Sequence, residues 1–145
     1  MRTIALRFAN NFAPAEGTIA AHQTIIAQFG YVWYGKLGNR VSVGVIKSIL
    51  ENESPRILLI HSGEAERYWA YVDKIQIEQP PEDQIPLYYR DRADDFKTWF
   101  RVIRFEKAPR DILSKCTVAS SGVSLSLASR HNMSPYFIID APDDK

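Results

Sequence analysis

The spacing of apolar residues predicts a strand and then a helix at the start of the chain. The segment TIALRF, residues 3–8, is short and apolar-rich, which is typical of a strand. The next apolar segment is TIAAHQTIIAQFG, with Thr18 as the expected N-cap and Gly30 as the expected C-terminal stop. Spacings of three and four, which indicate one face of a helix, relate Ile19, His22, Ile26 and Phe29.

The middle of the chain predicts a further strand, a helix and a hairpin. YVWYGK, residues 31–36, is a strand by its aromatic and β-branched content. Ser42 is placed to cap a second helix over residues 43–53. The continuous apolar run RILLIHS, residues 56–62, predicts a buried strand, which should pair with RYWAYVDKIQIE, residues 67–78.

The last third of the chain is less regular. Residues 79–97 hold three prolines and dense alternating charge, which predicts a long loop, either functional or merely solvated. TWFRVIRFEK, residues 98–107, predicts a strand with Trp99, Arg101, Ile103 and Phe105 on one face. A short helix in RDILSK and a closing strand in PYFIID follow, separated by a stretch of small residues that we leave unassigned. This order predicts an α+β domain with a mixed, curved sheet over residues 1–145.

Composition narrows the class of protein. The chain has 145 residues, 46% of them hydrophobic, which suits one domain with a substantial core. A net charge of +1 argues against non-specific coating of nucleic acid, although it allows a local basic rim. The single cysteine permits no internal disulfide and no cysteine-based zinc site, and no apolar run suits a signal peptide or a membrane helix. We therefore expect a cytoplasmic protein with no membrane partner, no metal and no cofactor.

Catalytic motifs are weak in this sequence. It contains no phosphate-binding loop, dinucleotide fingerprint, nucleophile elbow or HExxH helix. His61 and Ser62, with Asp73, could act as hydrolytic groups, but Ser-Gly is also ordinary turn chemistry. Cys116 could be a nucleophile, although a lone cysteine is more often a small buried hydrophobe. His22, on the apolar helix face, is better explained as a hydrogen-bonded core histidine.

Aromatic residues offer a stronger candidate site. Trp33, Tyr34, Trp69, Tyr71 and Trp99 fall on three predicted strands, where rings that face each other could enclose a nucleobase. The alternative is that they fill the core. Gly35 and Gly38 would let a ligand backbone approach closely.

Cations near these aromatics are candidate phosphate contacts. Their alternative is a solvated surface, since Asp91, Asp94 and Asp95 largely cancel the cations beside them. The candidates are Lys36, Arg40, Arg90, Arg92, Arg101 and Arg104.

Four segments resemble the PUA-like superfamily, and within it the EVE domains, which are related to YTH readers of methylated RNA. They are YVWYGKLGN, the apolar strand ILLIHSG, the strand YWAYVDKI and the Trp-led strand with its following helix, TWFRVIRFEKAPRDIL. The resemblance implies a pseudo-barrel of about five or six strands flanked by two or three helices. It also implies a pocket that receives one modified base flipped out of its strand.

The resemblance assigns roles to individual residues. Trp33 would be the stacking wall, Tyr34 and Gly35 would line the mouth, and His61 and Ser62 would lie at the rim. Trp69 and Trp99 are weaker candidates for the base-binding pocket. The segment ASSGVSL, residues 119–125, would donate hydrogen bonds from its backbone and from Ser120 and Ser121.

We expect from this a non-enzymatic module that recognises a modified base, with modified cytosine in DNA as the first candidate. It would be the sensing part of a bacterial defence or regulatory system, with catalysis supplied by a partner effector protein. Within recognition, the alternative is RNA binding in the manner of ASCH or PUA domains. From other classes, the alternatives are a small hydrolase or nuclease that uses His61 and Ser62, and a structural domain that binds protein.

Overall fold

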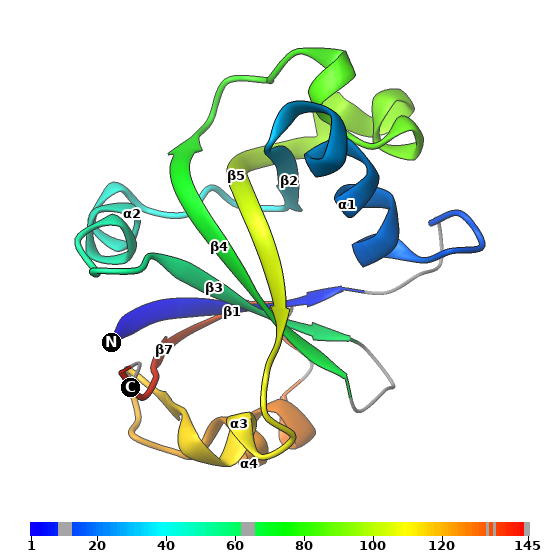
Figure 1. The fold of residues 1–145 in the computed structure, drawn as a ribbon. Coiled ribbons are helices and arrows are strands. Elements are labelled where there is room, and N and C mark those ends of the chain that lie inside the picture. The colour runs from blue at the N-terminus through cyan, green and yellow to red at the C-terminus, as the bar shows by residue number, and fades with distance from the viewer. Residues whose placement is uncertain (9–12, 62–65, 133, 135, 144–145) are drawn as a thin grey trace.

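A single curled sheet organises the molecule (Figure 1). The computed structural model describes residues 1–8, 13–61, 66–132, 134 and 136–143. Seven strands lie in the order β2-β5-β4-β3-β1-β7-β6. Their bounds are β1 (Arg2–Phe8), β2 (Val32–Leu37), β3 (Arg56–His61), β4 (Arg67–Gln76), β5 (Phe96–Lys107), β6 (Thr117–Val118) and β7 (Tyr136–Asp140). β1 and β3 run parallel, and the other pairs are antiparallel.

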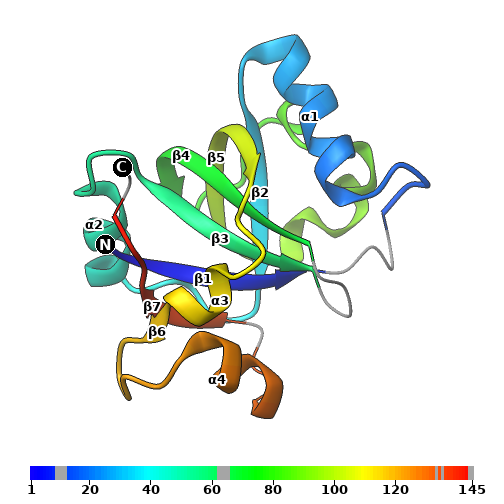
Figure 2. The same cartoon turned by 60° about the horizontal axis from the view of Figure 1, so that its bottom comes forward.

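Helices cover the sheet from three directions. α1 packs against β2 and β5, whereas α2 packs against β1 and β4. α3 and α4 lie together below β1 and β7 in Figure 1, and Figure 2 brings this side of the molecule forward. The helices are α1 (Thr18–Phe29), α2 (Val43–Leu50), α3 (Ile112–Lys115) and α4 (Leu125–His131), with 3-10 helices η1 (Glu82–Gln84) and η2 (Leu87–Asp95).

The predicted α+β class with a mixed, curved sheet is confirmed. Both long helices form where their apolar spacing indicates, and β3 and β4 pair as the expected hairpin, with Leu58 opposite Trp69. α1 ends at Gly30, which has the left-handed φ of 84° and donates its N–H to the Ile26 carbonyl at 2.7 Å. Thr18 was expected to be the N-cap, but it is the first residue of the helix, and Gly17 occupies the cap position.

Two segments are more ordered than the sequence indicated. Residues 79–97 fold into η1 and η2 rather than a long loop, and they bury Ile85, Tyr89 and Ala93. These apolar positions recur every four residues, but the charged residues between them hide the pattern. The unassigned stretch of small residues contains β6 and α4.

A bulge changes the expected faces of β5. Val102 pairs with Val72, but Arg104 pairs with Tyr71, so Ile103 has no opposite residue. The extra residue shifts the side-chain alternation by one position. Phe105 therefore packs against the same core cluster as Val102, instead of sharing one face with Ile103 as predicted.

Three clusters of buried side chains make up the interior. The largest lies inside the curl of the sheet and includes Ile4 and Phe100. A second packs α3 and α4 against the outside of β1, β3 and β7, with Trp69 among its members. The third, which we call the tryptophan cluster, joins Trp33 and Trp99 to the 3-10 helices. Its buried members are Trp33, Ile85, Tyr89, Ala93 and Trp99.

Candidate functional site

An open cavity of about 460 Å³ lies where β1, β2, α1 and η2 meet. Its volume falls within the roughly 300–1,000 Å³ of ordinary ligand pockets. Aromatic rings from four parts of the chain form much of its wall, and cationic side chains complete it. The rings are Phe8, Tyr34, Tyr88, Tyr89 and Phe96, and the cations are Arg7, Lys36 and Arg92.

The alternation of β2 supplies one wall. Side chains of successive strand residues point to opposite faces, so Tyr34 and Lys36 share a face while Trp33 turns away. Gly35 lies between them and lets a neighbouring ring come close, since a Cβ at this position would lie 2.6 Å from the Phe96 ring. The strand ends in a turn at Gly38, whose φ of 79° suits glycine.

Tyrosine side chains gather along the cavity. The ring of Tyr88 lies 4.9 Å from that of Tyr89, centroid to centroid, and Thr18 and Gly35 line the cavity with them. Burial raises the pKa of Tyr34, Tyr88 and Tyr89, so these phenols stay protonated at neutral pH. The cavity therefore presents neutral O–H groups.

A buried histidine supports this tyrosine wall from behind. The His22 ring lies 5.1 Å from that of Tyr34 and 5.0 Å from that of Tyr89, centroid to centroid. Its Nδ1–H donates to the Thr18 carbonyl at 2.8 Å, while Nε2 has no partner among the described residues. Burial lowers the pKa of His22 to about 4, so the ring is neutral. His22 is therefore a buried, hydrogen-bonded histidine, as predicted.

Two of the cavity cations have no carboxylate partner among the described residues. Lys36 Nζ donates to the carbonyls of Leu37 at 3.1 Å and Asn39 at 2.9 Å, and it lies 4.8 Å from the centre of the Tyr136 ring. Burial lowers the pKa of this amine. Arg7 Nε donates to the Ser134 carbonyl at 3.0 Å. Their positive charges are thus held in place by neutral groups.

Five of the residues singled out in the sequence line this cavity: Tyr34, Gly35, Lys36, Gly38 and Arg92. Trp33 and Trp99 instead belong to the tryptophan cluster, at 4% and 0% exposure. The Trp33 indole N–H donates to Gln84 Oε1 at 3.1 Å. Because β2 turns Trp33 away from Tyr34, its ring packs under the 3-10 helices and does not line the cavity.

The other pocket residues predicted from the sequence are dispersed. Trp69 is buried in the cluster under α3 and α4, with the Arg56 guanidinium 4.6 Å from its ring centre. His61 stacks on Phe8, a cavity residue, at 4.7 Å between centroids. Ser62 lies outside the described residues. A separate, shallow groove beside α4 and β7 is lined in part by Ser120 and Ser121.

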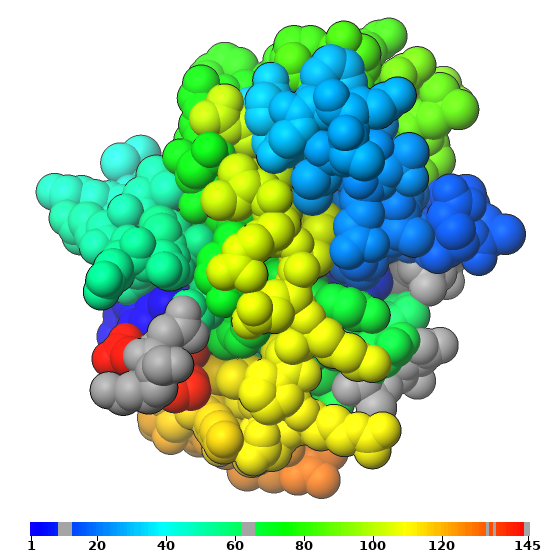
Figure 3. Space-filling model, in the orientation of Figure 1, coloured from blue at the N-terminus to red at the C-terminus, as the bar shows by residue number. Residues whose placement is uncertain are grey.

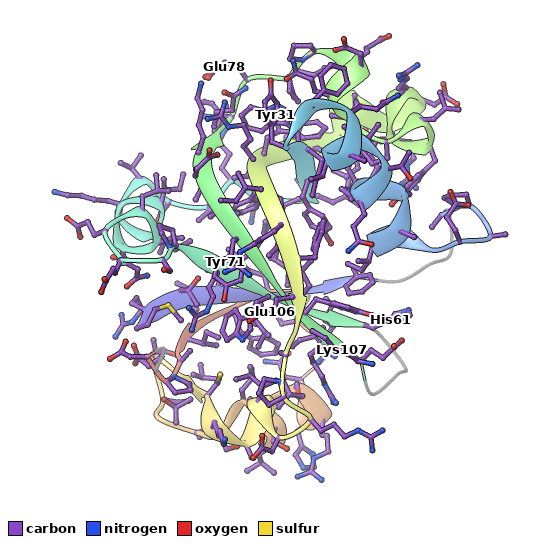
Figure 4. All side chains as sticks on the ribbon, in the orientation of Figure 1. Tyr31, His61, Tyr71, Glu78, Glu106 and Lys107 are labelled. Carbon is purple, nitrogen blue, oxygen red and sulfur yellow. The ribbon has the colours of Figure 1, made fainter. Side chains whose placement is uncertain are left out.

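The predicted phosphate contacts on β5 have acidic partners instead. Arg101 binds Asp73 through two hydrogen bonds of 2.8 and 3.2 Å. Arg104 lies 3.7 Å from the Tyr71 ring centre and bonds Glu106 at 3.1 Å, and the Tyr71 hydroxyl also donates to Glu106 (Figure 4). Figure 3 shows the β5 side chains as a band down this face of the molecule.

Two further predicted phosphate contacts lie outside the cavity wall. Arg40 is exposed beyond the turn that follows β2, and Arg90 is exposed on η2, where its Nε donates to the Glu82 carbonyl at 3.2 Å. Both belong to segments that also contribute cavity residues. Their role as phosphate contacts stays a prediction.

Little supports the catalytic alternatives. The His61 amide donates to the Glu66 carbonyl, so these two residues are neighbours. Asp73 follows Glu66 by seven residues of mostly extended chain, which separates it from His61 by on the order of 20 Å. Cys116 is buried, and desolvation raises its thiol pKa to about 11. In the described part of the chain, no group of three or more His, Cys, Asp or Glu residues could hold a metal ion. No helix among those residues is long and apolar enough to cross a membrane.

The sequence reasoning missed most of the cavity wall. Tyr88, Tyr89 and Phe96 lie in or beside the segment that was predicted to be a loop, and Phe8 and Arg7 end the first strand. One local signal could have found Tyr88 and Tyr89: they lie within a run in which apolar residues recur every four positions, which indicates a helical segment. Nothing local marked Arg7, because its role depends on the distant α4 and β7 segment.

Comparison with known families agrees with this fold. The family described as Pua-like matches residues 4–135, most of the 145-residue chain, and the protein therefore belongs to the Pua-like family. No curated protein and no solved structure matches the chain. Membership confirms the predicted superfamily and indicates nucleic-acid binding in general, since PUA-like domains are generally binding modules rather than enzymes. The narrower relation to EVE domains stays a prediction.

Proposed function

We propose that this protein recognises a modified base of nucleic acid, flipped out of its strand into the cavity between β2 and η2. Modified cytosine in DNA is the first ligand to test. The observation that carries the proposal is an open cavity of about 460 Å³ walled by aromatic rings, in a chain of the Pua-like family. Any catalytic step in the pathway would belong to a partner effector protein.

The chemistry of the wall suits a flat heterocycle. Stacking on an aromatic side chain contributes on the order of 1–3 kcal/mol per base. Extracting a base from a duplex costs a few kcal/mol, which stacking between two rings and two hydrogen bonds would offset. Tyr88, which is only partly buried, and Phe96 are the rings best placed to accept a base from outside.

Cations near the cavity would hold the rest of the strand. Arg92 lines the cavity, while Arg40 and Arg90 are exposed on the segments beside it. Arg101 and Arg104 contribute less, because carboxylates already neutralise them. Phosphate contacts of this kind position a strand without reading its sequence.

Fluorescence-anisotropy titration tests the proposal. Labelled 12-nucleotide DNA and RNA strands would each carry one central cytosine, either unmodified or 5-methylated. We expect Tyr88→Ala to weaken binding of the preferred strand about tenfold or more, since it removes one stacking wall. Tyr31→Ala is the matched control, because Tyr31 is also a half-buried tyrosine but packs under Arg101, outside the cavity.

Several outcomes would contradict the proposal. Equal losses in both tyrosine variants would place the interface elsewhere, and equal binding of methylated and unmodified strands would argue against a site for methylcytosine. A preference for RNA would favour the ASCH or PUA mode of recognition. Affinity that does not fall with added salt would argue against nucleic acid altogether.

A further inference from the structure

The charges around the cavity are unbalanced. Its lining includes the cations Arg7, Lys36 and Arg92, but no aspartate or glutamate among the described residues. Only Arg92 has a carboxylate nearby, with its Nε 3.9 Å from Asp95 Oδ2. By contrast, Arg101 and Arg104 on β5 are each paired with an acid. The cavity is thus a local region of positive charge on a chain whose net charge is only +1.

A hydroxyl in the cavity wall also lacks a partner among the described residues. Tyr34 lines the cavity and is 5% exposed, yet its hydroxyl makes no hydrogen bond within the described part of the chain. The oxygen keeps access to the cavity, so a ligand bound there can reach it. Because the phenol keeps its proton, what it offers a ligand is a donor.

The N-terminus of α1 adds to this field. Thr18, the first residue of this 12-residue helix, lines the cavity. Gly17 at the N-cap provides no side-chain hydrogen bond, and the first turn contains no acidic residue. The positive end of the helix dipole therefore lies at the cavity, as at helix termini that bind anions.

From these observations we infer that the cavity binds a nucleotide together with its phosphate, with Lys36, Tyr34 and the start of α1 around the phosphate and the rings of Tyr88 and Phe96 against the base. This inference rests on the proposed function and specifies its ligand. Every polar group it uses is a donor, and phosphate offers acceptor oxygens with a negative charge. The phosphate could belong to a strand or to a free nucleotide.

A neutral base alone would leave this arrangement incomplete. It would bring acceptors to some of the donors but no counter-ion to Lys36, which is partly desolvated and held only by carbonyls and the Tyr136 ring. Bound phosphate would supply that counter-ion and a partner for the Tyr34 hydroxyl. Charge-assisted hydrogen bonds of this type are about twice as strong as neutral ones.

Isothermal titration calorimetry with cytidine 5′-monophosphate and with cytidine measures the contribution of the phosphate. We expect the monophosphate to bind at least tenfold more tightly. Lys36→Met should bring the two affinities close together, and Tyr34→Phe should reduce their ratio severalfold. Lys74→Met, which removes an exposed lysine of β4 outside the cavity, should leave the ratio unchanged.

Tyr34→Phe keeps the test valid if Lys36→Met does not fold, because it removes only a hydroxyl that has no protein partner. Thermal melting of each variant checks the fold. Equal affinity for cytidine and its monophosphate in the wild type would overturn the inference, as would a ratio that neither variant changes.

Competition with a 12-nucleotide strand distinguishes the two sources of phosphate. Displacement of the monophosphate by the strand would show that nucleic acid supplies the group. Strand binding without any preference for the monophosphate would contradict this inference while the proposed function stands. A preference for the monophosphate with no strand binding would leave the inference intact and contradict the proposed function.

Discussion

Two neighbouring residues of β2, Trp33 and Tyr34, belong to regions of opposite character. Trp33 packs in the tryptophan cluster, where η1 and η2 cover it and Gln84 accepts its indole N–H. Tyr34, one position along, lines an open cavity, and its hydroxyl has no protein partner within the described residues. Both residues are at least 95% buried, so burial alone does not separate core from site.

What separates the two regions is whether the space beside the side chains is filled. In the tryptophan cluster, packing by distant segments fills the space around Trp33. In the cavity, side chains from β2, η2 and α1 instead surround open space. Tyr89 belongs to both regions and connects them. An aromatic-rich strand can therefore serve the core on one face and a ligand on the other.

The largest effect should come from Trp33→Ala, which tests the packed side of this comparison. Removing a buried tryptophan typically costs about 3–5 kcal/mol, through lost burial and the cavity left behind. We expect a loss of that size in the free energy of unfolding, measured by urea titration. Val43→Ala, at a side chain that is 83% exposed, should change it by less than about 0.5 kcal/mol. A Trp33→Ala protein of native stability that no longer binds nucleic acid would place Trp33 in the site.

A pH effect of nearly the same size should come from His22, behind the tyrosine wall. Its pKa is about 4 in the fold and about 6.5 when unfolded, so the unfolded chain takes up a proton first as pH falls. Stability from this group is complete above pH 6.5 and declines toward pH 4, by on the order of 3 kcal/mol. The nearby tyrosines keep their protons throughout this range.

The difference between wild type and His22→Phe isolates this titration from that of the carboxylates. In urea unfolding at pH 7.5, 6, 5 and 4, wild type should lose on the order of 3 kcal/mol more stability than His22→Phe. The exposed His131 is the control, since His131→Gln should follow the wild type. Parallel curves for wild type and His22→Phe would show that His22 is not buried in neutral form.

Local patterns predicted the fold well, but they could not predict which surfaces would be covered. Apolar spacing and Gly30 located α1, and two strand-like runs located the β3–β4 hairpin. The position of Trp33 depends on η1 and η2, whose Gln84 is 51 residues away in the chain. No window of sequence around β2 contains that information.

In the candidate site, too, the residues next to one another in the sequence were predicted, and those from distant segments were missed. Tyr34, Gly35 and Lys36 were predicted because they adjoin one another in an aromatic, glycine-containing strand. Tyr88 and Phe96 were missed because prolines and charges made their segment resemble a loop. Arg101 and Asp73 lie on different strands, β5 and β4. Bulges shift the alignment of these two strands, so the sequence alone could not predict that the two residues would pair.

Gly35→Ala should have a moderate effect on stability, and it tests the residue that lies between Tyr34 and Lys36 on β2. The new methyl group would lie 2.6 Å from the Phe96 ring, so the ring or β2 must shift. Overpacking of this kind costs about 1–3 kcal/mol. Urea unfolding measures that cost, and monophosphate binding should weaken because Phe96 is a cavity wall. The double variant Gly35→Ala with Phe96→Leu should recover part of the stability, and failure to recover any would locate the strain elsewhere.

The smallest effect should come from Asp73→Asn, which converts a paired cation into an unpaired one like Lys36. The Asp73–Arg101 pair is partly exposed, and such pairs contribute about 0.2–1 kcal/mol, less in high salt. We expect a stability change within that range in urea unfolding at low salt. Affinity for the 12-nucleotide strand should rise by twofold or less, because Arg101 lies outside the cavity. A tenfold rise would mean that Arg101 contacts phosphate once it is free of Asp73, and that the strand crosses β5. The interface would then be set by the pattern of neutralised charge across this surface as well as by the cavity.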